Sequence, residues 1–483
     1  MVDYVSAVNP DFGMVAPELT LLIAASLIML FIGWRRMPML APAITLLGIV
    51  VAFGYAVGQW GNQVSGFAGM VTCDNFGVIF KLIFLTAAGL SVLLVGQYLK
   101  SRGIDKPEYY ALIAISTVGM MAMANTTDLV VMFIGLEVMS VPLYVMAGFN
   151  RRSLESNEAG IKYFIMGAFA TAFLLMGIAF VYGAAGTTNL RQVVTDFNYI
   201  AAGRGLYLYA GVALILIGFG FKVGAVPFHS WIPDVYHGAP TPVTAFFSVA
   251  PKAAAVAVLL RIFLYGFADV GLVSQAFWVL SVLTMTLGNI LALRQDNVKR
   301  MLAYSSIAHA GYILVALTVG TDEAISSAIF YVIAYTFFNL GAFTIVALLE
   351  TRMGAESEFS ELSGLAKSAP VLSLLLAVFM FALSGFPPTV GFFGKFYIFR
   401  AAIEANFISL AVIGVLNSFV SVYYYLRVVK TCYFDDAEHA PQAVFVPATV
   451  GLVLFVTTVG TLGFGLFPQQ LLQFTRQAIF AFL

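Results

Sequence analysis

Residues 220–231 read GFKVGAVPFHSW, and residues 384–395 read SGFPPTVGFFGK. Both stretches interrupt long apolar runs with proline, glycine and a lysine. Proline lacks an N–H and clashes with the preceding helical turn, so Pro227 and the pair at 387–388 are expected to break their helices. Inside a membrane, the freed backbone groups are tolerated only where protein or water satisfies them. The two stretches therefore predict discontinuous transmembrane helices.

Apolar runs continue over nearly the whole chain on both sides of these interruptions. Of the 483 residues, 61% are hydrophobic and 10% are charged, whereas an average soluble domain has about 25% charged residues. Runs of about twenty residues are long enough to cross a hydrocarbon core of roughly 30 Å as helices. The composition excludes a water-soluble fold. The formal net charge of +0, without a basic aromatic cluster, argues against nucleic acid as a partner.

The spacing of the runs predicts an all-α integral membrane protein with a single membrane domain over residues 1–483. The first run, 14–34, has the length of a full span and lacks a preceding basic region, so it is expected to be a helix rather than a cleaved signal. We expect about fourteen transmembrane helices, near residues 14–34, 40–58, 74–98, 108–124, 127–148, 158–182, 206–238, 240–266, 273–293, 300–319, 324–350, 370–400, 407–430 and 446–467.

The broken helices, seventh and twelfth in this series, suggest an internal repeat. Helices 1–3 occupy residues 14–98, a first five-helix unit would cover 108–266, a second 273–430, and a last helix 446–467. Each broken helix is then the fourth of its unit, and an odd number of spans gives the units opposite orientation, as in inverted-repeat transporters. Lys222 precedes its break whereas Lys395 follows its own, so the repeat rests on architecture more than on residue identity.

Lysine and arginine set the expected orientation, because short cytoplasmic loops accumulate them. The loops after odd-numbered helices carry Arg35, Arg36, Lys100, Arg102, Lys106, Arg151, Arg152, Arg294, Lys299, Arg300, Arg352, Lys367, Arg427 and Lys430. The other side has little more than Arg191, Arg204 and Arg400. We expect the odd loops in the cytoplasm and both termini outside.

Ionisable residues near the middle of spans are the strongest functional signal. Glu137, Lys222, Lys252 and Lys395 each carry an insertion penalty of at least about 2.5–3.5 kcal/mol if charged. Burial disfavours the charged form of a lysine, so such a lysine can gain and lose a proton near the pH of the cell, and a neighbouring carboxylate such as Glu137 would tune it. We interpret the set as a proton relay. The alternative is that the lysines only pair within the bundle or snorkel to an interface.

Local sequence adds two histidines to the candidate relay. His309 lies in predicted helix ten and titrates near neutrality, so it can connect the two halves, or else be a neutral hydrogen-bonded histidine. His229 follows the break at Pro227 and would serve either as a relay or as a cap for freed carbonyls. Lys162 is expected to be a snorkelling anchor. Pro251, directly before Lys252, is expected to loosen its helix and admit water.

No redox site is recognisable in the sequence. There is no dinucleotide fingerprint, P-loop, cysteine set for iron–sulfur clusters, or paired histidines spaced for haem or zinc. We therefore expect a chain that binds no cofactor or metal and moves ions rather than electrons.

Several stretches around these residues carry a family resemblance. They are 133–137 (FIGLE), Lys222 through 227–234 (PFHSWIPD), 237–243 (HGAPTPV), Lys252, 299–306 (KRMLAYSS) and the Lys395 region. The sequence resembles the antiporter-like membrane subunits of respiratory complex I, which are also similar to subunits of multi-subunit sodium/proton antiporters and membrane-bound hydrogenases. Within that family it looks like the subunit N branch, whose mitochondrial counterpart is NADH dehydrogenase subunit 2. Lys395 favours this branch over subunit M, and the absence of a C-terminal extension favours it over subunit L.

The resemblance implies a division of roles. Glu137 and Lys222 would form a charge pair, Lys252 a central relay and Lys395 the terminal relay toward the outside. NADH, FMN, iron–sulfur clusters and quinone would bind partner subunits. The expected neighbours are other membrane subunits of the complex, including subunit M and small membrane subunits, in the lipid of a bacterial inner membrane or, if organellar, a mitochondrial inner membrane. The alternatives to a complex I subunit are a subunit of a sodium/proton antiporter or of a membrane-bound hydrogenase, and a scaffold with no transport function.

Overall fold

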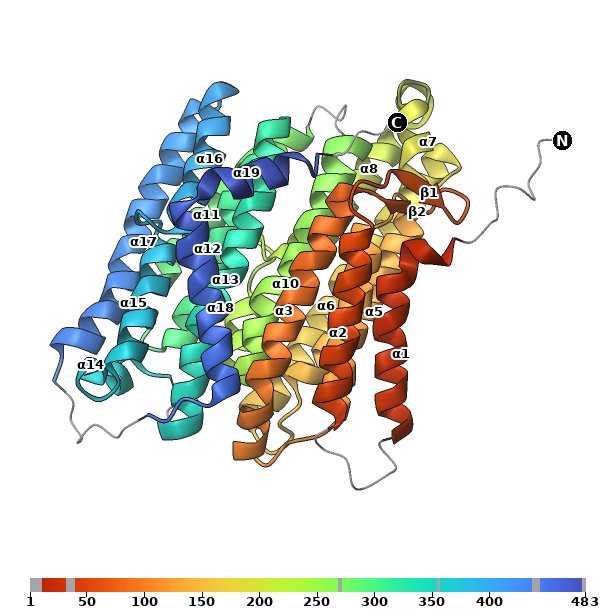
Figure 1. The fold of residues 1–483 in the computed structure, drawn as a ribbon. Helices are drawn as coiled ribbons and strands as arrows, with labels where there is room; N and C mark the ends of the chain where they lie inside the picture. The colour runs from red at the N-terminus through yellow and green to blue at the C-terminus, as the bar shows by residue number, and fades with distance from the viewer. Residues whose placement is uncertain (1–10, 32–39, 268–271, 354–356, 437–443, 480–483) are drawn as a thin grey trace.

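The computed structural model describes residues 11–31, 40–267, 272–353, 357–436 and 444–479, which form a bundle of helices (Figure 1). The helices of the first half are η2 (Phe12–Val15), α1 (Ala16–Phe31), α2 (Leu40–Gly58), α3 (Asn75–Ser101), α4 (Glu108–Ala124), α5 (Leu129–Ala147), α6 (Leu154–Ala185), α7 (Leu190–Thr195), α8 (Phe197–Val223), α9 (Trp231–Gly238) and α10 (Thr241–Arg261). The second half contains the π-helix η3 (Ile262–Gly266), α11 (Val273–Ala292), α12 (Val298–Val319), α13 (Asp322–Met353), η4 (Phe359–Leu362), α14 (Leu365–Ser368), α15 (Pro370–Ser384), α16 (Val390–Glu404), α17 (Ile408–Phe434), α18 (Ala448–Leu466) and α19 (Pro468–Arg476). Strands β1 (Val64–Gly66) and β2 (Val71–Cys73) pair antiparallel.

The predicted all-α membrane architecture is confirmed. Twelve described helices are long and apolar enough to span a membrane, while α4 and α15 are shorter apolar helices. The count of fourteen spans therefore stays a prediction. The sequence analysis missed the β1–β2 hairpin and the short helices α7, α14 and α19. It also placed the start of the seventh helix at residue 206, whereas α8 begins at Phe197 and has a kink at Arg204. Arg35 and Arg36 lie outside the described residues.

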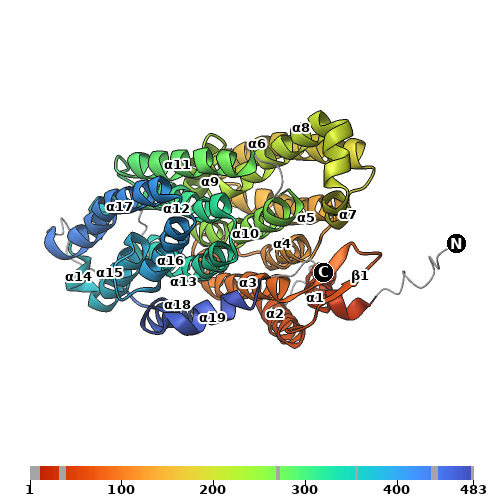
Figure 2. The same cartoon turned by 90° about the horizontal axis from the view of Figure 1, so that it is seen from above.

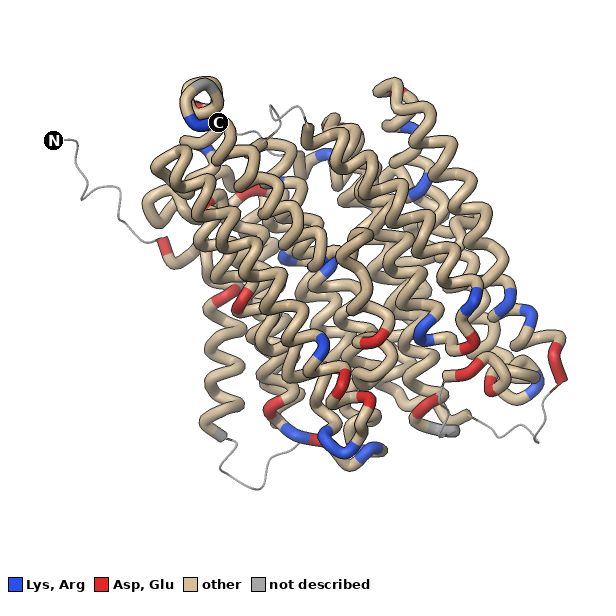
Figure 3. Tube along the Cα trace, turned by 180° about the vertical axis from the view of Figure 1, so that it is seen from behind, with Lys and Arg blue, Asp and Glu red and all other residues tan. Residues whose placement is uncertain are grey.

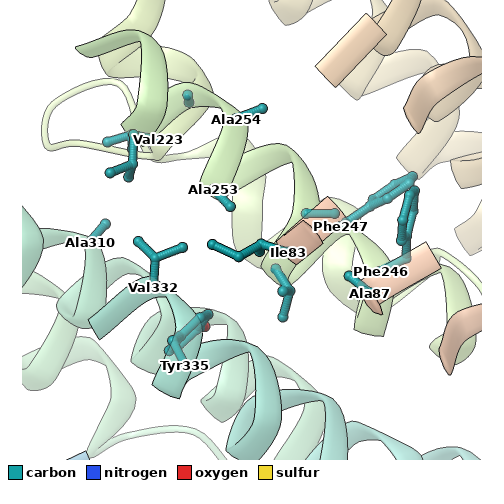
Figure 4. Close-up of a cluster of buried hydrophobic side chains, with 14 of the residues drawn as sticks. Ile83, Ala87, Val223, Phe246, Phe247, Ala253, Ala254, Ala310, Val332 and Tyr335 are labelled. Atoms are coloured by element: carbon teal, nitrogen blue, oxygen red, sulfur yellow. The ribbon is translucent and has the colours of Figure 1, made fainter. Parts of the chain in front are cut away.

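Three helices make the centre of the bundle. Nearly every residue of the membrane-crossing part of α10, α12 and α13 is buried, and α3 is the next most buried. Seen from above, these helices lie between the end formed by α5, α6 and α8 and the end formed by α15, α16 and α17 (Figure 2). Figure 4 shows Ile83 of α3, Ala253 of α10 and Val332 of α13 converging on one another. A charged side chain on α10 or α12 therefore cannot snorkel to lipid.

Both predicted helix breaks are present, and they begin in the same way. The first half-helices α8 and α15 end at Gly224 and Gly385, whose left-handed φ values of 78° and 82° only glycine adopts readily. Each glycine belongs to a Schellman motif, in which Ala225 N–H donates to Gly220 O at 2.8 Å and Phe386 N–H to Phe381 O at 2.9 Å. Each motif thus supplies protein donors to carbonyls in the last turn of its half-helix.

The two five-helix units remain a prediction, and helix packing agrees with them. The first two helices of the first unit, α4 and α5, approach closely where Gly119 faces Gly135. The corresponding pair of the second unit, α11 and α12, approach at Gly288 and Gly311, where an added Cβ would meet the backbone of the other helix. Small residues permit such approaches between membrane helices. The close pairs occupy the same place in the two proposed units.

Pro251 lies inside α10 without breaking it, and the expected entry of water beside it stays a prediction. The helix continues from Thr241 to Arg261 through the proline. Because Pro251 has no N–H, the carbonyl of Phe247 loses its normal helical partner. The hydroxyl of Tyr236 on α9 donates to Phe247 O at 3.2 Å. A side chain from the neighbouring half-helix therefore supplies the bond that the proline removes.

This exchange of donors predicts a compensating pair of substitutions. Tyr236→Phe should destabilise the protein by about 1–3 kcal/mol, because it leaves a buried carbonyl without a donor. In the Pro251→Ala background the same change should be nearly neutral, because the backbone N–H gained at position 251 then donates a hydrogen bond to the Phe247 carbonyl. Thermal unfolding of the four purified proteins measures this coupling. Equal effects of Tyr236→Phe in both backgrounds would contradict it.

Candidate functional site

Lys222 lies in the last turn of α8, immediately before the first break. Its ammonium donates to Ser140 Oγ at 2.8 Å and to Tyr144 OH at 3.1 Å, both on α5. The ring of Tyr144 lies 5.2 Å from Nζ and the ring of Tyr163 lies 5.8 Å from it, within cation–π range. The buried lysine is therefore held by hydroxyls and aromatic faces.

Glu137 lies on the same face of α5, and it does not contact Lys222 directly. Its Oε1 accepts a hydrogen bond from Thr171 Oγ1 of α6 at 3.0 Å. Among the described residues, no ion pair within 4.0 Å joins Glu137 to Lys222. Ser140 and Tyr144, one and two turns further along α5, reach the ammonium, and the charge pair of Glu137 with Lys222 stays a prediction. A charge on Glu137 would act on Lys222 through space rather than through a direct contact.

Lys252 projects from α10 into the centre of the bundle. Its Nζ donates to the carbonyl oxygen of Ser306 on α12 at 2.6 Å and also to the Ser306 hydroxyl. The ring of Tyr335 on α13 lies 5.9 Å from the ammonium. No carboxylate among the described residues pairs with Lys252, so its proton has hydroxyl neighbours rather than a fixed counter-ion.

His309, one turn beyond Ser306 on α12, binds two tyrosines. Its Nδ1 lies 2.5 Å from Tyr331 OH and its Nε2 lies 2.9 Å from Tyr425 OH. The Tyr425 hydroxyl lies 2.5 Å from Ser305 Oγ, so the chain of hydroxyls continues beyond the ring. The ring follows Ser306, the partner of Lys252, on the same helix. A hydroxyl both donates and accepts, so either imidazole tautomer can be accommodated.

Lys395 of α16 turns back across the second break. Its Nζ donates to Leu383 O at 3.0 Å and Ser384 O at 2.9 Å, the last carbonyls of α15, and to Ser418 Oγ of α17 at 2.9 Å. A cation is stabilised at this end of a helix by the macrodipole. Lys222 and the Lys395 ammonium thus both lie at the C-terminal end of a first half-helix, although the residues stand on opposite sides of their breaks.

The remaining predicted residues lie closer to the ends of the bundle. His229 is half-buried in the first break, and its Nδ1 has no hydrogen-bond partner among the described residues. Lys162 pairs with Glu158 at 2.6 Å and with Asp234 at 2.8 Å, and Asp234 also pairs with Arg300 at 3.0 Å. Lys162 is therefore an ion-pairing residue between α6 and α9 rather than a simple anchor.

Aromatic rings separate Lys222 from Lys252. The ring of Tyr163 stacks on Trp231, with centroids 4.5 Å apart, and Trp231 contacts Tyr236 edge-on at 6.2 Å. No hydrogen bond joins the two lysine clusters in the described part of the chain. Among the same residues, no group of three or more His, Cys, Asp or Glu could hold a metal ion.

Residues 126–421 match the family described as NADH:quinone oxidoreductase/Mrp antiporter, transmembrane. The chain belongs to this family. It is 50% identical over 437 residues to NADH-quinone oxidoreductase subunit N of Trichlorobacter lovleyi, with 90% of each chain covered. It is 38% identical over 477 residues to subunit N 1 of Solibacter usitatus, with 98% of each chain covered. These relatives confirm the expected resemblance to the subunit N branch.

Solved structures of the family share the fold. A chain of respiratory complex I from Thermus thermophilus with bound aureothin matches with a TM-score of 0.80 and 32% identity, covering 95% of this chain and 98% of that one. A chain of the Mrp complex from Dietzia sp. DQ12-45-1b matches with a TM-score of 0.86 at 21% identity, covering 97% of both chains. The second likeness shows the common fold alone.

Two buried charged clusters of this family member escaped the sequence reasoning. Lys81 of α3 is fully buried and lies 3.0 Å from Glu18 of α1. Lys299 of α12 and Glu350 of α13 are also buried, with Nζ 3.9 Å from Oε1. Lys81 stands within an apolar run, so the criterion that selected Lys222 would have found it. Lys299 and Glu350 lie at predicted helix ends and resemble loop charges in the sequence.

The contacts of Lys222 predict unequal effects of substitution on stability. Glu137→Gln should change the free energy of unfolding by less than about 0.5 kcal/mol, because no contact to Lys222 is lost. Ser140→Ala should lower it by about 1.5–3 kcal/mol, the range for a hydrogen bond to a charged group. Thermal unfolding of the purified proteins distinguishes the two. A loss in Glu137→Gln as large as in Ser140→Ala would show a direct ion pair.

Proposed function

We propose that this chain is a proton-translocating membrane subunit of an NADH-quinone oxidoreductase, equivalent to subunit N of its relatives. The observation that carries the proposal is the set of buried ionisable groups bonded to hydroxyls. Lys222, Lys252, His309 and Lys395 each contact a serine or tyrosine hydroxyl deep in the bundle. Intramembrane ionisable groups in such settings mark proton relays.

The arrangement supports an order of transfer within the chain. Glu137 acts electrostatically on Lys222 and so favours its protonated form. Lys252 and Lys395 exchange protons through His309, whose two nitrogens contact Tyr331 and Tyr425. Water is required between Lys222 and Lys252, and the unpaired Nδ1 of His229 in the first break offers it an acceptor or donor. The redox chemistry belongs to partner subunits that hold NADH, FMN, iron–sulfur clusters and quinone.

We also propose the orientation predicted by the positive-inside rule. The lower end of the bundle in Figure 3 carries more lysine, arginine and acidic positions than the upper end. That end would face the cytoplasm of a bacterial cell, and the start of α1 and α19, both at the upper end in Figure 1, would face the outside.

The relay predicts that replacing its central lysine stops pumping. Lys252→Met in the assembled complex should lower NADH-driven proton translocation by about tenfold or more, because the proton-accepting amine is lost. Proton uptake into proteoliposomes measures translocation, and NADH:ferricyanide reduction checks assembly. Lys367→Gln is the matched control, since Lys367 is exposed and pairs with Asp436 at the surface. Normal pumping by Lys252→Met would refute the relay.

A groove beside Lys395 supports a neighbouring subunit at α16 and α17. It encloses about 580 Å³, with Lys395 and Ser418 on its floor and Phe396, Val415 and Phe419 on its walls. Intramembrane charges normally face protein or a water-filled cavity rather than lipid. We therefore propose that a helix of a second antiporter-like subunit, the expected subunit M, covers this groove. The small membrane subunits would contact other faces.

A charge in the groove should prevent this contact. Phe419, which is 77% exposed, lies in the groove, whereas Phe455, 66% exposed, lies on α18 away from it. Phe419→Arg should yield a membrane arm that lacks the neighbouring subunit, and Phe455→Arg should assemble, although both carry a similar insertion penalty. Native gel electrophoresis of solubilised membranes separates the two results. Full assembly of Phe419→Arg would place the neighbour elsewhere.

A further inference from the structure

A stripe of polar residues runs along one face of the buried helix α10. Thr241, Thr244, Ser248 and Lys252 follow at intervals of three or four residues, which places them on one side of a helix. All four side chains are buried, and the rest of α10 is almost entirely apolar. The stripe extends over roughly 16 Å, from the start of the helix to the central lysine. Polar side chains in this position need partners, because lipid and apolar neighbours supply none.

The lower end of the stripe meets a buried acid–base cluster. Glu350 Oε2 accepts from Thr241 Oγ1 at 2.5 Å, and Glu350 Oε1 accepts from Ser357 Oγ at 2.5 Å. Lys299 donates to Ala239 O at 2.7 Å, while its Nζ remains 3.9 Å from Glu350 Oε1. The two charged groups are thus close without forming a direct hydrogen bond. Glu155 and Arg102 also act on Lys299 from the same end of the bundle.

The middle of the stripe is joined to neighbouring helices by hydrogen bonds. Thr244 Oγ1 donates to Tyr236 O at 2.8 Å, and Asn339 of α13 donates from Nδ2 to Ser248 Oγ at 2.6 Å. Asn339 is fully buried, and its Oδ1 has no hydrogen-bond partner among the described residues. A buried amide oxygen in this position can accept a hydrogen bond from water. The amide thus faces the stripe next to Ser248, one turn below Lys252.

We propose that Lys299 and Glu350 form a proton-uptake site that supplies Lys252 along the polar face of α10. The inference rests on the proposed function and on its orientation, with the Lys299 end in the cytoplasm. Glu350 takes a proton from the aqueous side, Lys299 stabilises its charged form, and the hydroxyls of Thr241, Thr244 and Ser248 lead toward Lys252 with water at Asn339. This path enters the centre of the chain without passing Lys222 and the aromatic rings beside it.

A purely structural pair would account for part of these contacts but not for the stripe. Hydroxyls at Thr244 and Ser248 add nothing to a link between Lys299 and Glu350, because they lie further along α10 from Thr241. A structural pair would also be stronger as a direct, hydrogen-bonded contact than at 3.9 Å. Substitutions in the stripe therefore separate the two roles.

The test uses the assembled complex in proteoliposomes. Thr244→Val with Ser248→Ala removes the two hydroxyls between Thr241 and Lys252 and leaves Lys299, Glu350 and Lys252 in place. We expect this variant and Glu350→Gln each to lower the initial rate of NADH-driven proton uptake by about tenfold or more. Thr318→Val is the matched control, since Thr318 is buried on α12 and its hydroxyl donates to Leu314 O of its own helix. Its pumping should equal that of the unaltered complex.

The outcomes distinguish this inference from the proposed function. Wild-type pumping by the stripe variant overturns the uptake path, whatever the result for Glu350→Gln. If Lys252→Met abolishes pumping while the stripe variant does not, the relay stands and protons reach Lys252 by another route. If Lys252→Met itself pumps normally, the proposed function fails and the uptake path fails with it. The stripe variant changes no charge, and NADH:ferricyanide reduction measures its assembly. The comparison with Lys252→Met therefore does not depend on whether Glu350→Gln folds.

Discussion

The lack of hydrogen-bond partners in hydrocarbon is the constraint on which the rest of this structure depends. Every backbone group released by a break and every ammonium group inside the bundle must find a partner in the protein or in trapped water. The Schellman motifs at Gly224 and Gly385 supply donors to carbonyls in the last turns of α8 and α15. Tyr236 supplies the donor that Pro251 lacks, and Lys395 itself binds the last carbonyls of α15. The irregular backbone and the buried lysines are therefore solutions to the same problem.

Hydroxyl groups, rather than carboxylates, contact the three buried lysines of the candidate relay. A carboxylate would fix a lysine in its charged form, because the attraction between opposite charges is strong where the dielectric constant is low. Serine and tyrosine hydroxyls hold Lys222, Lys252 and Lys395 while accepting or donating as the proton moves. Of the nearby carboxylates, Glu137 is bonded to Thr171, and Glu350 to Thr241 and Ser357. Lys81, outside the candidate relay, does pair directly with Glu18. The arrangement keeps protonation reversible.

The sequence predicted the elements whose causes are local and missed those whose causes are distant. The apolar runs predicted α2 and α4 to the residue, and the prolines at 227 and 387–388 predicted both breaks, because length and proline geometry act within a few residues. The hydroxyl partners of Lys222 were not predicted, since the contacts of its ammonium depend on how α5, α6 and α8 pack together. Lys299 and Glu350 were missed because only tertiary packing brings two helix ends together and buries them.

The central helices explain why the two halves of the chain can act as one unit. Lys252 belongs to the first proposed unit, yet its hydrogen-bond partner Ser306 and the next ionisable group, His309, belong to the second. The bond between Pro251's helix and α9 fixes α10 relative to the first break, while Ser306 fixes it to α12. A movement of α9 would therefore be transmitted to α10 and to the contact that holds Lys252. Because α10, α12 and α13 are packed without access to lipid, such a movement must shift these contacts together rather than be absorbed by a flexible surface.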